Sequence, residues 1–90
     1  MTDAASTDVE VVASAVSVQR SVLVEVNALG FVCSVQILSP VVRMWDTATI
    51  NERFCAVARV AHARWCALRA GDSDGGALAA VAAQERALNF

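Results

Sequence analysis

Apolar residues recur every three or four positions between residues 49 and 68, TINERFCAVARVAHARWCAL. With a rotation of about 100° per residue, these positions fall within a stripe about 80° wide: Ile50, Phe54, Val57, Ala61, Trp65 and Leu68. This spacing predicts an amphipathic helix over residues 48–70 that buries one side. Thr49 and Glu52 have the T-x-x-E spacing of a capping box, and Gly71 stands where the helix would end.

Alternation of apolar and polar residues predicts two β-strands before this helix, at residues 21–27 and 31–38. The link between them runs from Asn27 to Gly30, two residue types that tolerate the backbone angles of a hairpin turn. Ser39-Pro40 ends the sheet, because proline has no amide hydrogen for the ladder. One face of the hairpin is expected to carry the surface on which the helix packs: Val22, Val24, Val26, Phe31, Cys33, Val35 and Ile37. The opposite face is expected to be mixed: Leu23, Glu25, Val32, Ser34 and Gln36.

Residues 9–18 fit either a helix face or an alternating strand, and their valine density favours a strand at 11–18. After Gly71, the sequence DSDGG indicates a solvated connector, and residues 76–88 indicate a short second helix with a weak apolar stripe. The predicted fold is α+β: a three-stranded antiparallel sheet (11–18, 21–27, 31–38) packed by a long helix (48–70) and followed by a short C-terminal helix (76–88). Residues 1–8 are expected to form a flexible lead to a single domain at 9–90.

The composition of the 90-residue chain predicts an apolar surface that a partner covers. Hydrophobic residues make up 57% and the mean hydropathy is +0.51, which is high for a small soluble monomer. No charged residue within the segments 12–18 or 31–37 protects a strand edge, so we expect a homodimer or heterodimer through a sheet edge or the outer sheet face. The candidate partner-binding residues are Leu23, Val32, Met44 and Trp45.

Three features predict a reduced, cytoplasmic protein. No apolar run is long enough to span a membrane, and the acidic N-terminus lacks the basic region of a secretory signal. The three cysteines are an odd number without C-x-x-C spacing, which does not suit a disulfide framework.

Cys55, His62 and Cys66 share one side of the predicted helix, away from the main stripe. His62 and Cys66 have the i, i+4 spacing of a metal-chelating pair, but two ligands do not make a structural zinc site. A Cys–His nucleophile would lack a third member, and DSDGG lacks the glutamate that completes a calcium loop. The sequence therefore predicts no enzyme, no catalytic, metal or cofactor site, and no small-molecule substrate. The cysteines are interpreted instead as small side chains against which a helix or second subunit packs.

The basic residues leave nucleic-acid binding as an alternative function. All seven are arginines, and the net charge is −2. On the predicted helix only Arg53 and Arg64 lie in line, which favours a solvated helix face over a phosphate-binding row. The candidate nucleic-acid contacts are Arg20, Arg43, Arg53 and Arg64. Of the two tryptophans, Trp65 is assigned to the core and Trp45 to an exposed contact.

The segment SVLVEVNALGFVCSVQILS, the proline-containing crossover and the capped helix ending AVARVAHARW resemble the YbaB/EbfC family of small nucleoid-associated proteins. They resemble equally the actinobacterial relatives of that fold attached to type VII (ESX) secretion loci. The resemblance covers about residues 14–68. It implies dimerisation through the sheet and no enzymatic activity.

The chain departs from this family at its start. The family usually has a long N-terminal helix that contributes to the dimeric clamp proposed to hold DNA, and residues 1–10 cannot supply it. The sequence therefore favours a non-enzymatic, dimerising, chaperone-like adaptor of an actinobacterial secretion system. A nucleoid-associated DNA-binding protein is the alternative.

Overall fold

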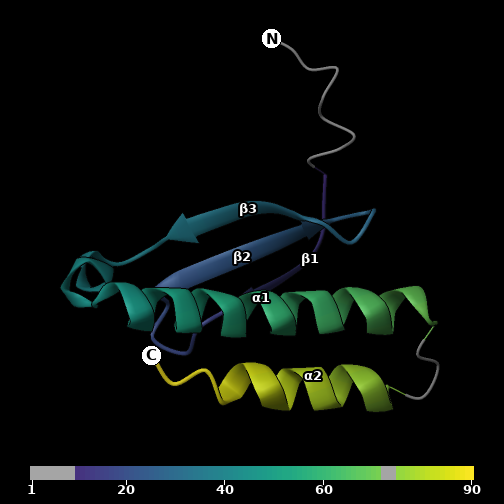
Figure 1. Ribbon diagram of the computed structural model, residues 1–90. Helices are drawn as coiled ribbons and strands as arrows, with labels where there is room; N and C mark the ends of the chain where they lie inside the picture. The colour runs from purple at the N-terminus through teal and green to yellow at the C-terminus, as the bar shows by residue number, and fades with distance from the viewer. Residues whose placement is uncertain (1–9, 72–74) are drawn as a thin grey trace, which may run out of the picture.

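The computed structural model describes residues 10–71 and 75–90, which form one three-stranded sheet with two helices on the same face (Figure 1). The elements follow in the order β1 (Val11–Val16), β2 (Val22–Asn27), β3 (Val32–Ile37), a 3₁₀ helix η2 (Pro40–Met44), α1 (Thr47–Arg69) and α2 (Gly76–Arg86). The predicted α+β fold and its order of elements are confirmed, including the strand that was favoured within residues 9–18. The predicted flexible lead at 1–8 and most of the predicted connector, residues 72–74, lie outside the described residues.

The core lies between α1 and the first two strands. The sheet is antiparallel in the order β1-β2-β3, so β2 is central. Val22, Val24 and Val26 of β2 point to the helix side and are fully buried, as the alternating pattern predicts. The neighbouring β1 places only alanines there, Ala13 and Ala15, and these small side chains let α1 lie close to the strand.

The turn between β2 and β3 forms as its residues predict. The Asn27 side-chain oxygen accepts hydrogen bonds from the backbone amides of Leu29 and Phe31, at 3.0 and 3.1 Å. Gly30 has a φ of +86°, in the left-handed region that favours glycine. The half-buried Trp65 of α1 lies against this turn, and its indole nitrogen donates to the carbonyl of Ala28 at 3.2 Å. The long helix is thereby fixed to the far end of the hairpin.

The start of α1 differs from the expected capping box. The helix begins at Thr47 with Asp46 as its N-cap, and the Asp46 carboxylate accepts from the amide of Thr49 at 2.7 Å. Hydrogen bonds from the Thr49 amide and hydroxyl, with the nearby charge of Arg53, lower the pKa of Asp46. Because the helix starts two residues before Thr49, that residue is the capped donor and not the cap. The other end agrees with the sequence: α1 ends at Arg69, and Gly71 has a φ of +68°.

The third strand is not covered as the sequence predicts. Val35 and Ile37 do face the helix side, since they pair with Val24 and Val22, but they are 47% and 59% exposed. A helix about 10 Å across covers about two strands, and α1 lies over β1 and β2. The expectation that Phe31, Cys33, Val35 and Ile37 form part of the buried surface under α1 is therefore wrong: Cys33 is half-buried and the other three are exposed.

The side assigned to Val32 is also wrong. Strict alternation places Val32 on the face away from the helices, but the register between β2 and β3 shifts next to Val26. This irregularity pairs Val32 with Val26 on the helix side, where Val32 is half exposed. A periodic pattern cannot reveal such a shift.

Candidate interaction surfaces

The outer edge of β1 is closed by an ion pair between the two helices. Arg64 of α1 and Glu85 of α2 are 3.0 Å apart. The Glu85 carboxylate accepts from the amide of Val16 at 2.9 Å, and the Arg64 guanidinium donates to the carbonyl of Ser14. These are the backbone groups that an added strand would need. The prediction that no charge protects residues 12–18 is therefore wrong, because the charges come from 50 and 69 residues further along the chain.

The ion pair also changes the acidity of its carboxylate. The hydrogen bond from Arg64 lowers the pKa of Glu85, and the amide of Val16 and the charge of Arg64 act in the same direction. Burial raises the pKa and is the second-largest effect, but it does not cancel the lowering by Arg64. Glu85 is thus held ionised in the arrangement that closes the β1 edge.

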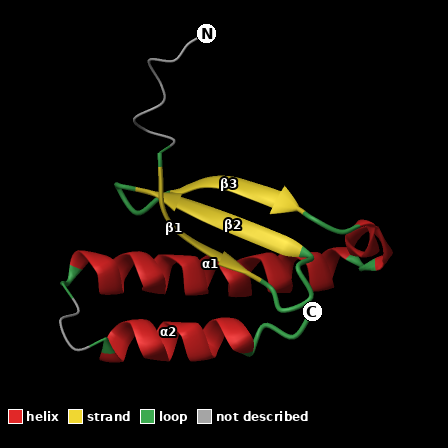
Figure 2. Ribbon diagram, turned by 180° about the vertical axis from the view of Figure 1, so that it is seen from behind, coloured by secondary structure: helices red, strands yellow, loops and turns green. Residues whose placement is uncertain are grey.

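In the described part of the chain, no strand pairs with the outer edge of β3, which is called the open edge below. The amide of Leu38 donates to the carbonyl of Ser21 at 2.9 Å. Because alternate residues of an antiparallel strand bond to the neighbouring strand, this bond shows which residues of β3 face β2. The backbone groups of Val35 and Ile37, one and three residues before Leu38, therefore point away from β2. Figure 2 shows β3 at the margin of the sheet, on the side away from α2. The open edge thus carries two half-exposed apolar side chains beside backbone groups that no other described strand pairs.

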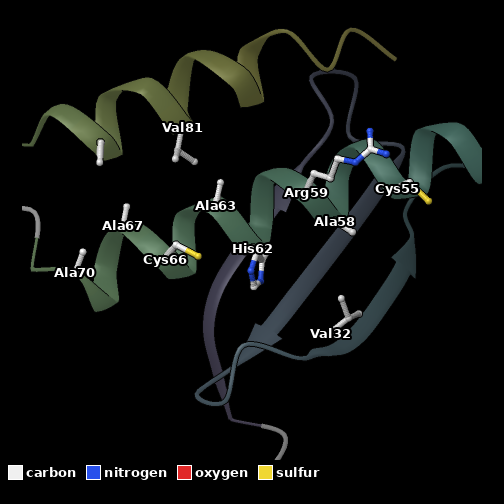
Figure 3. A pocket seen from close by; sticks show the side chains of 11 residues that line it. Val32, Cys55, Ala58, Arg59, His62, Ala63, Cys66, Ala67, Ala70 and Val81 are labelled. Carbon is white, nitrogen blue, oxygen red and sulfur yellow. The ribbon is translucent and has the colours of Figure 1, made fainter.

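A shallow apolar groove of about 890 Å³ runs along the outer side of α1 (Figure 3). Val32 lies at its β3 side, and Val81 of α2 lies at its other side. Cys55, His62 and Cys66 line it together, so the prediction that they share one helix side is confirmed. Within residues 10–71 and 75–90, no three His, Cys, Asp or Glu side chains are grouped so that they could hold a metal ion.

Two predicted contact residues are engaged inside the molecule. The guanidinium of Arg53 lies 4.4 Å from the ring centroid of Trp45 and 5.0 Å from that of Phe90. The two rings meet edge to face at 5.9 Å. Trp45 is therefore half-buried against the end of the chain, whereas the sequence assigns it to an exposed contact.

The remaining predicted site residues are not brought together. Leu23 is half-buried on the outer sheet face, Val32 lines the groove, and Met44 of η2 is 82% exposed. Among the candidate DNA contacts, Arg64 is in the ion pair, while Arg20 and Arg43 are exposed.

The sequence analysis expected a helix or a second subunit to pack against the cysteine side of α1, but it did not predict an open groove there. Cys55, Ala58, His62 and Cys66 follow one another at steps of three, four and four, a second helical stripe made mostly of small residues. The sequence carries no comparable signal that the helix-facing side of β3 is left uncovered, because this depends on where α1 lies across the sheet.

In the described part of the chain, neither α1 nor α2 is long and hydrophobic enough to cross a membrane.

Comparisons of the chain with protein-family models, with curated proteins and with solved structures found no match. The resemblance to the YbaB/EbfC family therefore stays a hypothesis.

Proposed function

We propose that this chain is a non-enzymatic interaction module that dimerises by pairing β3 of one copy with β3 of another. The observation that supports this is the difference between the two sheet edges. The β1 edge is closed by Arg64 and Glu85, and the β3 edge is open along Val35 and Ile37. Two such edges related by a twofold axis would pair as antiparallel strands and extend the sheet to six strands.

The energetics of this pairing favour a weak dimer. Fully burying a valine or isoleucine side chain stabilises by about 1.5–3 kcal/mol, and Val35 and Ile37 are each about half exposed. Two residues from each copy would then contribute about 4 kcal/mol, to which the new backbone hydrogen bonds add. Association costs at least about 4 kcal/mol in lost freedom, which offsets this side-chain contribution. The net affinity therefore depends on the new backbone hydrogen bonds, at about 0.5–1.5 kcal/mol each, and we expect self-association in the high micromolar range.

Sedimentation velocity from about 5 to about 500 µM tests the proposal. The mass of the wild-type chain should rise with concentration from 9.5 kDa towards twice that value. Val35→Glu should remain monomeric, because it places a carboxylate in the paired edge. Val18→Glu is the matched control, since Val18 is 53% exposed but follows β1, and it should dimerise like the wild type. A 9.5 kDa species throughout, or equal behaviour of the two variants, would contradict the proposal.

A specific biological role for the dimer is supported only by the resemblance to the YbaB/EbfC family and its secretion-associated relatives. A chaperone-like adaptor of an actinobacterial secretion system needs a protein-binding surface, and the chain has apolar surface for that purpose. The DNA-binding alternative is weaker, because Arg53 and Arg64, two of its four candidate contacts, have partners within the fold.

A further inference from the structure

The long helix has a second apolar side that nothing in the described residues covers. Its sheet side is occupied by β1 and β2, and α2 packs beside it. The stripe through Cys55, Ala58 and Cys66 instead faces the groove, and both cysteines are exposed. A helix that buries a single side normally carries charged residues opposite to it, so this composition indicates a surface built for contact.

Among the described residues that line the groove, Arg59 is the only charged one, and none is a carboxylate. No ion pair involving Arg59 occurs among the described residues. His62, the other polar residue, is stacked on Trp65 with 5.4 Å between ring centroids. An occupant of complementary charge would therefore carry an acidic side chain near Arg59.

The walls of the groove favour a helix as the occupant. Backbone groups in the middle of α1 and α2 are paired within their own helices, so an extended peptide would lay unpaired amides and carbonyls over an apolar floor. A helix satisfies its own backbone. The small side chains of Ala58, Ala63 and Cys66 also allow a second helix axis to approach to about 8 Å. From Cys55 to Ala70 the groove offers about 22 Å, or four helical turns.

We propose that this groove binds an amphipathic helix of a partner protein, with large apolar side chains over Ala58, Cys66 and Val81 and an acidic residue paired with Arg59. The interaction goes beyond the proposed dimer and uses a different surface.

A second copy of this chain fits the groove poorly. Two α1 helices that met through this side would offer each other only the small side chains of the same stripe, Cys55, Ala58 and Cys66, and no large apolar side chain to fill the groove. The exposed positions of α2 offer only small or polar side chains: Gly76, Ala77, Ala79, Ala80, Ala83, Gln84 and Arg86.

Fluorescence anisotropy with labelled 18-residue peptides tests this proposal on the full chain. The probe peptide has leucines at helical i, i+3, i+4 and i+7 spacing and glutamates at the flanks of the stripe. One control peptide has lysine in place of each glutamate, and the other has a central proline that prevents a continuous helix. We expect the glutamate peptide to bind at tens of micromolar, and the lysine peptide at least about tenfold more weakly. The proline peptide should not bind.

Two protein variants locate the binding. Arg59→Glu should reverse the preference in favour of the lysine peptide, and because Arg59 is exposed the fold should be unaffected. Ala58→Glu should abolish binding of the glutamate peptide by placing a carboxylate in the floor. Bound peptide should also slow the alkylation of Cys55 and Cys66 by N-ethylmaleimide, with the half-buried Cys33 as the internal comparison.

Three results would overturn the proposal: no binding of the glutamate peptide at millimolar concentration, equal binding of the glutamate and lysine peptides, or unchanged preference in Arg59→Glu. Protection of Cys55 and Cys66 that increases with protein concentration in the absence of peptide would mean that a second copy fills the groove, and would overturn it as well. Val35→Glu separates this surface from the dimer, because that variant should lose self-association and keep peptide binding.

Discussion

Gly30 combines a backbone angle and a lack of space that exclude other residues. Its φ is +86°, and a Cβ there would lie 2.9 Å from the nearest ring carbon of Trp65. We expect Gly30→Ala to lower the free energy of unfolding by about 2–4 kcal/mol, of which about 1–2 is the left-handed backbone and the rest the clash with the ring. Urea denaturation followed by circular dichroism measures this loss.

Gly71→Ala is the matched control for that prediction. Its φ is +68°, but no described residue other than its chain neighbour has an atom within 4 Å of the added Cβ, so only the backbone cost of about 1–2 kcal/mol should appear. Equal losses in the two variants would show that Trp65 does not press on the turn.

The turn itself could be predicted from Asn27 and Gly30, but its contact with Trp65 could not, since the two sites are brought together only when α1 docks.

Asp46 is the residue that sets the start of α1. Asp46→Ala should lower the melting temperature because it removes the acceptor for the Thr49 amide. Glu52→Ala should leave it unchanged, since the expected capping box does not form. Because the pKa of Asp46 is lowered in the fold, its contribution is complete above the ordinary value of 3.8 and is lost as the pH falls through the lowered pKa. Melting curves of both variants, with no difference at pH 7, would refute this assignment.

At the scale of elements, the sequence predicts each helix and strand better than it predicts their contacts. Local periodicity is enough for β2 and α1, because their apolar spacings follow from the geometry of one element. The closed edge of β1 instead depends on Arg64 and Glu85, which meet only after both helices have packed. The register shift opposite Val26 likewise depends on pairing between strands, and it changed the side on which Val32 lies.

The ion pair that closes β1 should make stability depend on pH. The pKa of Glu85 is lowered in the fold from an ordinary value of 4.5, so its stabilisation is present at neutral pH and is lost as the pH falls through the lowered pKa. We expect Glu85→Gln to cost about 0.5–1 kcal/mol at pH 7, a value kept small by the partial exposure of the pair. The difference from wild type should shrink between about pH 5 and pH 3.

Glu52→Gln serves as the reference for that titration, because Glu52 is exposed on α1. Urea unfolding at each pH gives the free energies. A cost for Glu85→Gln that stays constant down to pH 3 would show that the carboxylate is not the group that titrates.

At the scale of the molecule, the two edges of the sheet differ in charge. The β1 side is closed by charges, while the β3 edge and the groove along α1 leave apolar side chains exposed. The high hydropathy of the sequence predicts exposed apolar surface of this kind. The sequence left open which of the two strand edges is exposed, because that depends on where the helices lie across the sheet.

The same distribution of charge argues against DNA as the main partner. A protein that binds duplex DNA needs several free basic side chains within reach of phosphates, and each contact contributes to a steep dependence on salt. Arg64 is held by Glu85 and Arg53 lies over Trp45, which leaves Arg20 and Arg43 exposed among the candidate contacts.

We therefore expect no binding of a random 20-base-pair duplex below about 100 µM protein, even at about 50 mM salt, in a fluorescence anisotropy titration. Micromolar affinity that falls steeply with salt, and that Arg20→Gln with Arg43→Gln reduces, would restore the DNA-binding alternative. Loss of that binding in Val35→Glu would further show that the dimer carries it.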